Sequence, residues 1–408
     1  MELGPVFRAL IHNRVRFWLV TLEVALTLAI VVNCVSLALE RRGEFLRDSG
    51  IDEENILLVR AEPFAPEYSE ESYLNAARDR DLERLRAFPG VRAVAAMSAV
   101  PLSGGGSATG RKAEGFEGDS STAPFYVVSP GALEALGVEL VAGRDFTPAE
   151  YDVPETEEGE GQDQPAILTR ALATKLFPQG DALGKRIVSG QGDSSNIVVG
   201  IVEQMHNSWP NAESIDGHVM LLAGQPGHPA WGINYMVRVE EGALETVEAG
   251  VDELLLGLDG GRIIETQPLT EVKRRTYGGA IGMMKMLTAV VVLLVLVTAL
   301  GIVGLTSFSV NQRRRQIGTR RALGATRQDI LRYFLLENWM VTASGLALGL
   351  GMAYGLNYWL TKVAEAPKLD WELLAGGMVL LWVSGLLAAL VPALRATRVA
   401  PVVATKTV

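Results

Sequence analysis

The sequence contains one cysteine and four histidines among its 408 residues. Because Cys34 has no second cysteine to pair with, no disulfide can form within the chain. The histidines do not follow an HxxxH spacing, and without cysteine ligands to help them the sequence predicts no metal site. A G-x-S-x-G nucleophile elbow is missing as well. These absences point away from covalent or metal-assisted chemistry in this chain.

A complete phosphate-binding Walker A motif is also absent. The nearest match spans residues 105–112, where Arg111 stands at the position of the required lysine and Lys112 at that of the hydroxyl residue. We interpret this stretch as a flexible loop rich in glycine and serine. The chain is therefore expected to bind no cofactor of its own.

Long apolar runs are abundant by contrast. Hydrophobic residues make up 48% of the chain, and they concentrate in four runs of about 20 residues or more, the length that crosses ~30 Å of hydrocarbon. The first run is longer than the roughly 7–15 residues of a signal-peptide core and precedes no clear cleavage site, so we interpret it as an uncleaved anchor. The predicted transmembrane helices cover residues 17–39, 280–310, 333–361 and 371–394.

Charge is distributed unevenly along the chain. Residues 40–279 carry 40 Asp and Glu against 21 Lys and Arg, a net charge of −19, whereas the other residues carry 16 basic against 7 acidic residues, a net charge of +9. Because lysine and arginine favour the cytoplasmic side of a membrane, residues 1–16, 311–332 and 395–408 are predicted to be cytoplasmic. Residues 40–279 and the short loop 362–370 then lie outside. The basic residues indicate sidedness and not nucleic-acid binding.

The long outer segment alternates between strand-like and helix-like patterns. Short runs rich in Val, Ile and Leu, such as residues 54–62, are separated by amphipathic stretches such as residues 69–90. This alternation predicts an α+β domain built from small βαβ units. The acidic stretch 151–165 is predicted to be a solvated loop. The polar residues that follow the first span and precede the second fit stalk helices and short loops equally well.

Three charged residues lie at the ends of the apolar runs. Glu23, Lys285 and Glu337 are each close to a predicted membrane interface, where a long side chain can reach the headgroups. We therefore interpret them as interfacial residues and not as a proton relay, which also argues against a proton-driven carrier.

The stretch between the second and third spans has a strong pattern of local structure. Helix-forming residues run from Gln312 to Leu323, and Gly324 fits the position that ends a helix. Thr326, with Asp329 three residues later, resembles a capping box in front of an apolar run. The sequence thus predicts a helix, a tight turn and a second helix.

The same stretch also carries six arginines before its first acid. Membrane sidedness alone accounts for residues 313–315. It does not account for the small and apolar residues that interrupt the charge in residues 318–326. That combination predicts a surface that docks on another protein.

Several separated motifs resemble one family. Residues 313–338, "RRRQIGTRRALGATRQDILRYFLLEN", resemble the cytoplasmic loop of the MacB/FtsX family of ABC-transporter permeases, with Gln316 where many relatives carry an acid. Residues 125–147, 166–187 and 196–204 are similar to successive blocks of the MacB-type periplasmic domain. The tail, residues 392–404, resembles the family ending after the fourth span.

The resemblance implies an α-helical membrane protein with four transmembrane helices and an α+β periplasmic domain, residues 40–279, in the bacterial inner membrane with both termini cytoplasmic. It implies a non-catalytic permease subunit that couples ATP hydrolysis to movement of the periplasmic domain, for efflux of a periplasmic substrate. Because only 16 residues precede the first span, ATP and Mg are expected on a separate ABC ATPase dimer. A second permease copy, a periplasmic adaptor protein, an outer-membrane duct and membrane lipid are the other expected partners.

Two further roles stay open within the family. An FtsX-like member would regulate periplasmic cell-wall hydrolases, and a third class extracts lipoproteins. The larger outer domain of this chain favours the efflux role over the FtsX-like one.

The resemblance also assigns residues to the docking surface, the coupling helix of residues 311–332. These are Ile317, Gly318, Arg321, Ala322, Leu323, Gly324, Ala325, Thr326 and Arg327. In the third span, two GxxxG pairs permit close helix approach, either within the chain or in a homodimer. These pairs are Gly345 with Gly349, and Gly351 with Gly355.

Overall fold

The computed structural model describes residues 14–152, 163–190, 194–209, 217–364 and 366–399. The chain divides into two compact units, which we call the membrane unit (Met1–Leu46 with Gly279–Val408) and the outer unit (Arg47–Gly278). Parts of three predicted segments lie outside the described residues, namely the N-terminal segment, the acidic loop and the tail.

The membrane unit contains four long apolar helices and one short polar helix. Each of the four is long and apolar enough to cross a bilayer, which confirms the predicted number of transmembrane helices. α2 continues beyond the first apolar run, so the polar residues that follow this run are helical. The five helices are α2 (Arg14–Leu46), α8 (Gly278–Gln312), α9 (Arg314–Ala322), α10 (Arg327–Ala364) and α11 (Trp371–Thr397).

Glycines on α10 allow this helix to pack closely on α2. A Cβ added at Gly345 would lie 2.7 Å from Cβ of Val24, and one added at Gly349 would lie 3.0 Å from Cα of Ala25. Neither distance leaves room for a side chain. The first GxxxG pair therefore serves packing within the chain, which is one of the two roles the sequence left open.

The second GxxxG pair of α10 faces a different direction. A Cβ added at Gly351 or Gly355 would meet no atom of the described residues within 4 Å. Both glycines are exposed in the isolated chain. Their role in a homodimer stays a prediction.

Buried amides tie α10 to α2 and α11. The side chain of Asn33 on α2 donates to the carbonyl of Ala353 at 3.2 Å, and Asn357 donates to Oδ1 of Asn33 at 3.1 Å. Asn338 donates to the carbonyl of Gly385 on α11 at 3.0 Å. Hydrogen bonds between transmembrane helices contribute about 0.6–2 kcal/mol each, so this set fixes the register of the three helices.

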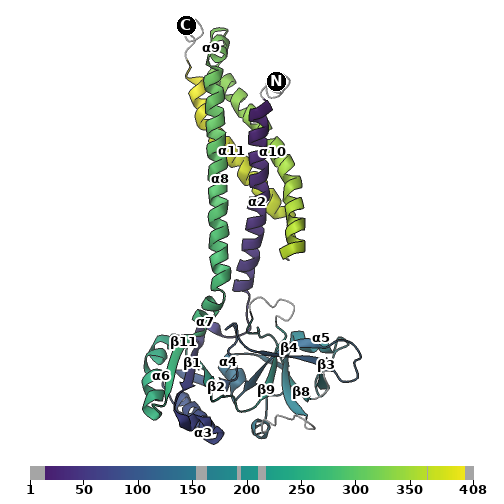
Figure 1. Ribbon diagram of the computed structural model, residues 1–408, viewed down its shortest axis with the longest axis vertical. Coiled ribbons are helices and arrows are strands. Elements are labelled where there is room, and N and C mark those ends of the chain that lie inside the picture. The colour runs from purple at the N-terminus through teal and green to yellow at the C-terminus, as the bar shows by residue number, and fades with distance from the viewer. Residues whose placement is uncertain (1–13, 153–162, 191–193, 210–216, 365, 400–408) are drawn as a thin grey trace. The chain divides into compact units, whose positions relative to one another are not determined.

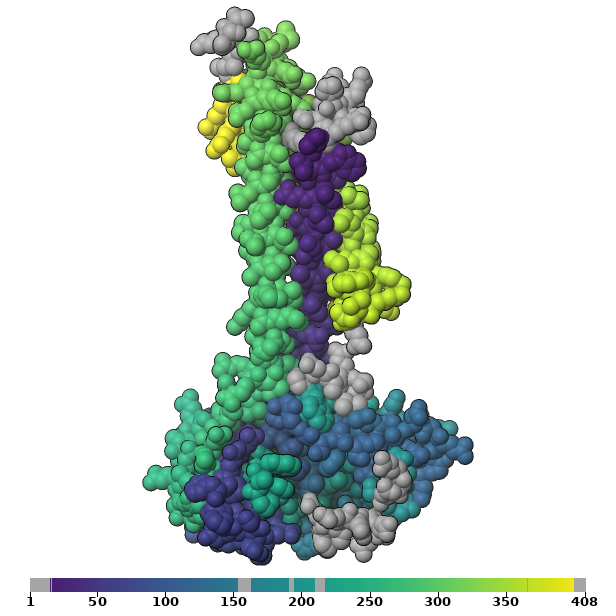
Figure 2. Space-filling model, in the orientation of Figure 1, coloured from purple at the N-terminus to yellow at the C-terminus, as the bar shows by residue number. Residues whose placement is uncertain are grey.

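α8 makes fewer contacts than the other long helices. The hydroxyls of Thr27 on α2 and Thr298 on α8 lie 2.8 Å apart, and Ile302 packs into the apolar cluster of the unit. Much of the remaining surface of α8 is apolar and exposed, including Leu293, Leu296 and Leu300. Figure 2 shows this helix, in green, uncovered along its length on the visible face.

Four antiparallel strands form one half of the sheet in the outer unit. Their order is β11, β1, β10 and β2, and Figure 1 shows them beside α3 and α6. The bounds are β11 (Arg262–Pro268), β1 (Ile56–Pro63), β10 (Ile233–Val239) and β2 (Val91–Met97).

Six further strands close into a ring. Each pairs with the next in the order β4, β3, β7, β8, β6 and β9, and β9 then pairs in parallel with β4. A single residue pair, Met97 with Val128, joins the ring to the four-stranded half, and β5 (Leu140–Gly143) pairs with β8. The ring strands are β3 (Ser107–Ala113), β4 (Ser121–Val128), β6 (Gln164–Thr169), β7 (Arg186–Ser189), β8 (Ser195–Val202) and β9 (Met220–Ala223).

The fold class of the outer unit is α+β, as predicted, but two sequence-based expectations need correction. The sequence predicted βαβ units, which pair their strands in parallel. Among the described strands only β4 with β9 and β6 with β8 are parallel, and the other pairs are antiparallel. The stretch 105–112, expected to be a flexible loop, enters β3.

The helices of this unit are α3 (Glu71–Arg86), α4 (Ala132–Leu136), α5 (Arg170–Leu176), α6 (Leu244–Leu258) and α7 (Leu269–Thr276), with short 3-10 turns η1 (Glu53–Asn55), η2 (Pro66–Ser69) and η3 (Pro148–Tyr151).

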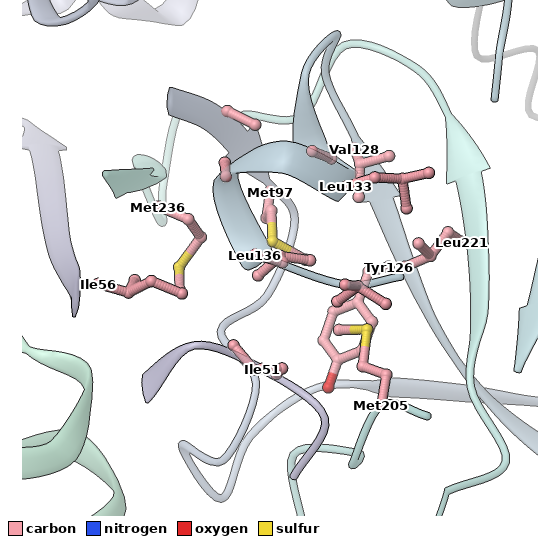
Figure 3. Close-up of a cluster of buried hydrophobic side chains, with 14 of the residues drawn as sticks. Ile51, Ile56, Met97, Tyr126, Val128, Leu133, Leu136, Met205, Leu221 and Met236 are labelled. Carbon is pink, nitrogen blue, oxygen red and sulfur yellow. The ribbon is translucent and has the colours of Figure 1, made fainter. Parts of the chain in front are cut away.

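Strand alternation builds a core on each face of the four-stranded half. Leu57 and Val59 of β1 face α3 and α6, where Leu85 and Val251 cover them. Ile56 of β1 belongs to the cluster on the other face, which includes α4 and ring residues and is drawn in Figure 3. A fully buried side chain of this size contributes about 1.5–3 kcal/mol. The cluster of Figure 3 joins the two halves of the sheet, and the other cluster fastens α3 and α6 to the four-stranded half.

An ion pair lies beneath the helical layer of the outer unit. Arg262 of β11 and Asp81 of α3 are each 1% exposed, and a guanidinium nitrogen lies 2.8 Å from Oδ1 of Asp81. The hydroxyl of Tyr235 donates to Oδ2 of the same carboxylate at 2.6 Å. Burial acts to lower the pKa of Arg262, but its hydrogen bond to Asp81 raises that pKa above the usual range. The guanidinium of Arg262 therefore stays protonated.

The first and last parts of the outer unit are joined to each other. Glu53, in the segment that follows α2, accepts a 2.8 Å contact from Nζ of Lys273 in α7. The hydroxyl of Ser49 donates to the same carboxylate. Ile51, labelled in Figure 3, belongs to the same apolar cluster as Leu269 of α7. The incoming segment and the outgoing helix of this unit thus lie side by side.

Candidate functional site

The basic turn is a short helix followed by a sharp reversal. α8 ends at Gln312, and α9 begins two residues later at Arg314 (Figure 1). The sequence predicted one helix from residue 312, whereas the structure has a break at Arg313. This arginine bonds to residues of α10, 3.1 Å from Glu337 and 3.2 Å from the hydroxyl of Tyr333. Arg313 is therefore more than a marker of sidedness.

The end of α9 confirms the predicted helix–turn–helix. Gly324 has a φ of 101°, and its amide donates to the carbonyl of Arg321 at 3.2 Å while that of Ala325 donates to Arg320 at 3.0 Å. These two bonds define a Schellman turn. A side chain at Gly324 would strain the backbone, because residues other than glycine avoid this φ.

The start of α10 is capped as the sequence indicates. The amide of Thr326 donates to Oδ2 of Asp329 at 2.9 Å, and the amide of Asp329 donates to Oγ1 of Thr326 at 3.2 Å. This reciprocal pattern is a capping box with aspartate in place of glutamate. Schellman turn and capping box together make the segment from α9 to α10 rigid.

One face of α9 is turned into the membrane unit. Ile317 is 4% exposed and Gly318 is buried. Ile317 belongs to a cluster with residues of α8, α10 and α11, among them Phe334 and Ala396. These two residues were predicted to dock on another protein, and the structure corrects this because neither is accessible.

Arg321 also points inward. Its guanidinium donates to the carbonyls of Thr397, at 3.3 Å, and Val399, at 2.5 Å, at the C-terminal end of α11. A cation is favourable at this end of a helix, where carbonyl groups lack partners. These bonds fasten α9 to α11, and contact of the half-buried Arg321 with a partner stays a prediction.

The other face of α9 and the turn are open to solvent. Leu323 is 84% exposed, although leucine is usually buried. Ala322, Gly324, Thr326 and Arg327 are exposed with it, while Ala325 is half-buried. Three exposed arginines lie along α9, Arg314 and Arg315 at its start and Arg320 near the turn. The arrangement suits insertion of Leu323 into an apolar groove with an acidic rim.

The site has no features of catalysis. Within the described ranges, no group of three or more His, Cys, Asp or Glu residues could hold a metal ion. The exposed groups of the turn are arginines, small residues and one leucine, and none of them is an activated nucleophile or base. The geometry fits a binding surface.

Two family patterns match this chain. The MacB-like periplasmic core domain matches residues 23–254, more than half of the chain. The FtsX-like permease C-terminal region matches residues 288–401, which include α9 and the turn. The chain belongs to the MacB/FtsX family of ABC-transporter permeases. The outer unit is therefore the periplasmic domain of a MacB/FtsX permease, and the chain is a membrane protein.

Named relatives of this permease are distant in sequence. It is 26% identical over 228 residues to the macrolide export ATP-binding/permease protein MacB of Chromobacterium violaceum, covering 54% of this chain and 33% of that protein. It is 25% identical over 358 residues to MacB of Neisseria meningitidis serogroup B, covering 85% and 51%. The uncharacterized ABC transporter permease YknZ of Bacillus subtilis is 22% identical over 336 residues, covering 79% and 77%. The chain thus spans between a third and about half of the length of these two MacB proteins.

Solved structures of the family cover the periplasmic region. The periplasmic region of MacB from Actinobacillus actinomycetemcomitans is 16% identical, with a TM-score of 0.36, and covers 57% of this MacB/FtsX permease and 96% of that chain. The extracellular domain of YknZ is 16% identical, with a TM-score of 0.33, and covers 52% and 100%.

Sequence reasoning missed the inward contacts of the turn. Arg313 and Glu337 form an ion pair that the sequence analysis assigned to two separate roles, a sidedness charge and an interfacial acid. The available signal was their position, because a basic and an acidic residue flank the same membrane boundary. The partners of Arg321 are backbone carbonyls, and no side-chain pattern could have indicated them.

Proposed function

We propose that this chain is the permease subunit of a MacB-type ABC transporter that transmits movement from a separate ATPase to its periplasmic domain. The observation that carries the proposal is Leu323, an 84% exposed leucine held on a rigid turn among arginines. Rigid, exposed apolar anchors are typical of binding hot spots. ATP and Mg would be bound by the ATPase dimer, and the permease itself would bind no cofactor.

The contacts of the inner face of α9 determine which helices would move when a partner displaces α9. Ile317 packs against α10 and α11, and Arg321 holds the end of α11. A partner that displaces Leu323 would therefore move α9, α10 and α11 as one body. Gly345 and Gly349 allow α10 to contact α2 directly, so α2 would follow.

Movement of α2 would reach the periplasmic domain through the chain itself. Residues directly after α2 form the incoming segment, which Glu53 joins to the outgoing helix α7. A change of shape in the domain would then drive efflux of a periplasmic substrate through an adaptor protein and an outer-membrane duct. Two permease copies would serve one ATPase dimer, and the open pair Gly351 and Gly355 is the candidate contact in a homodimer. The complex would lie in the bacterial inner membrane, with both termini cytoplasmic.

The test is copurification of the tagged full-length chain in mild detergent, followed by mass spectrometry. We expect ABC ATPase subunits to copurify with the wild-type chain. Leu323→Asp should reduce their amount at least tenfold, because it places a carboxylate where an apolar groove is expected. Leu256→Asp is the matched control, since Leu256 is 45% exposed on α6 of the outer unit, and it should leave the ATPase bound.

Two results would contradict the proposal. The first is undiminished ATPase with Leu323→Asp, provided that the variant inserts into membranes as the wild type does. The second is periplasmic inaccessibility of a cysteine placed on α6 in a Cys34→Ser background. An adaptor and duct among the copurifying proteins would favour efflux, whereas a cell-wall hydrolase or a second, different permease would favour the two other roles.

A further inference from the structure

A polar cleft lies at the free edge of the four-stranded half of the outer unit. Its volume is about 550 Å³, within the range of roughly 300–1,000 Å³ that is typical of ligand sites. One wall consists of β1 and the edge strand β11, another of α7, and α6 contributes Asp252. All lining residues belong to the outer unit, so the cleft is complete within it.

An acidic group in this cleft lacks a partner. Oδ1 of Asp252 is shielded from solvent and accepts no hydrogen bond from the described residues. A shielded carboxylate oxygen without a hydrogen bond is costly, and such an atom usually marks a missing ligand or ion. Asp252 lines the cleft, so a ligand bound there would lie against this side chain.

A basic group in the same cleft is also free. α7 contains three consecutive basic residues, of which Lys273 binds Glu53 at 2.8 Å and Arg274 binds Glu271 at 2.6 Å. The third, Arg275, lines the cleft and its side chain forms no hydrogen bond or ion pair with the described part of the chain. Arg275 and Asp252 thus present opposite charges to one space without pairing with each other.

Two further charged residues line the cleft, Arg60 of β1 and Glu265 of β11. Arg60 donates to Asn234 at 3.2 Å and lies 3.7 Å from Glu62. Glu265 of β11 is exposed and stands opposite Arg60 in the strand register. Asp252 and Arg275 are the charged groups that α6 and α7 bring to the cleft, whereas Arg60 and Glu265 lie on its strands.

We propose that this cleft binds a small zwitterion, with an ammonium group on Asp252 and a carboxylate on Arg275. Free amino acids and short peptides have this chemistry. A guanidinium can bind a carboxylate through two parallel hydrogen bonds, and the side chains of Leu58, Ile264 and Val272 give the cleft an apolar surface between its polar groups. The proposal does not rest on docking of an ATPase.

The ligand would touch the outgoing helix. Arg275 and Thr276 lie at the C-terminal end of α7, directly before Tyr277 and the start of α8. Occupancy of the cleft would therefore bridge α6 and α7. This contact would link ligand binding to the one helix by which the chain leaves the outer unit.

The experiment measures binding to the full-length chain in nanodiscs, without any ATPase. The probes are the free amino acids and a panel of di- and tripeptides at up to 10 mM, followed by calorimetry on the tightest binder. N-acetylated and C-amidated forms of that binder remove one charge each, and both should bind at least tenfold more weakly. Asp252→Asn should bind the N-acetylated form as tightly as the unmodified probe. Arg275→Gln should bind the C-amidated form as tightly as the unmodified probe.

Matched controls separate the site from general charge effects. Glu253→Gln on α6 and Arg274→Gln on α7 change the same charges at neighbouring positions outside the cleft, and both should bind as the wild type does. Thermal unfolding of each variant verifies that the outer unit is intact. The proposal is wrong if no member of the panel binds, or if Asp252→Asn and Arg275→Gln bind the zwitterion as tightly as the two controls do.

Discussion

The membrane unit and the outer unit bury polar groups in different ways. The membrane unit uses mainly neutral groups, such as the amides of Asn33 and Asn357, with close backbone contact at Gly349, and its buried acid Glu337 pairs with Arg313 just after the end of α8. The outer unit buries charge, with Arg262 and Asp81 both 1% exposed. Neutral amides need only one or two partners to be satisfied, whereas a buried charge needs an opposite charge of fixed geometry. The outer unit therefore depends more on single side chains than the membrane unit does.

The largest expected effect on stability comes from removing one member of the buried ion pair of the outer unit. Arg262→Ala leaves Asp81 charged and without its ionic partner, and we expect a loss of about 3–5 kcal/mol in the stability of the outer unit. Hydrogen exchange of α3 and β11 peptides, measured on the full-length chain, should rise accordingly. Arg274→Ala, which removes an exposed pair, should cost about 0–1 kcal/mol. Equal protection in the two variants would contradict the role given to the buried pair.

A buried histidine makes the outer unit sensitive to acid. Burial, assisted by Arg47 and Lys273, lowers the pKa of His206 to about 4, against the opposing effects of Glu53 and Asp48. The unfolded chain takes up this proton near pH 6.5, so stability is complete above that pH and falls as the pH drops towards 4. The loss from this residue reaches up to about 2–3 kcal/mol by pH 4.5.

A comparison of variants separates the contribution of His206 to the pH dependence of stability from the contribution of the acidic residues. The unfolding free energy of the outer unit should fall less steeply between pH 7 and 4.5 in His206→Gln than in the wild type. His228→Gln is the control, because His228 is exposed, and it should keep the wild-type slope. If both variants follow the wild type, His206 is not responsible for acid sensitivity.

The membrane half of the comparison can be tested at two glycines of one helix. Gly349→Val places side-chain atoms where a Cβ alone would lie 3.0 Å from Ala25, and overpacking of this type costs about 1–3 kcal/mol. Gly351→Val meets nothing within 4 Å in the described residues of the chain and should leave the monomer unchanged. Thermal unfolding in detergent measures both. Equal melting temperatures would show that α10 does not depend on close contact with α2.

These two glycine pairs also show what the sequence could predict. Both pairs have the same spacing, so the sequence indicated close helix approach for each but could not tell which pair faces α2. The turn at Gly324 and the cap at Thr326 were predictable because they depend on neighbours within a few residues. The roles of Ile317, Gly318 and Arg321 were not, because they depend on where the distant α11 ends.

In the outer unit, too, local elements were predictable from the sequence and long-range contacts were not. Most strands and helices were indicated by their local periodicity, and the α+β class followed from their alternation. The closed ring was not predictable, because its last pairing joins β4 to β9 over about 100 residues of sequence and pairings this distant leave no local pattern. The mostly antiparallel pairing of the strands could not be predicted for the same reason, because alternation of strands and helices does not show which strands become neighbours.

The contact of Glu53 with Lys273 has a mechanical consequence for the outer unit. Tension applied to the incoming segment and the outgoing helix would load the short path between η1 and α7. α7 follows β11 directly and η1 precedes β1 directly, so this path also reaches the four-stranded half of the sheet. Movement of either connection would therefore be passed to the other and to the strands beside them.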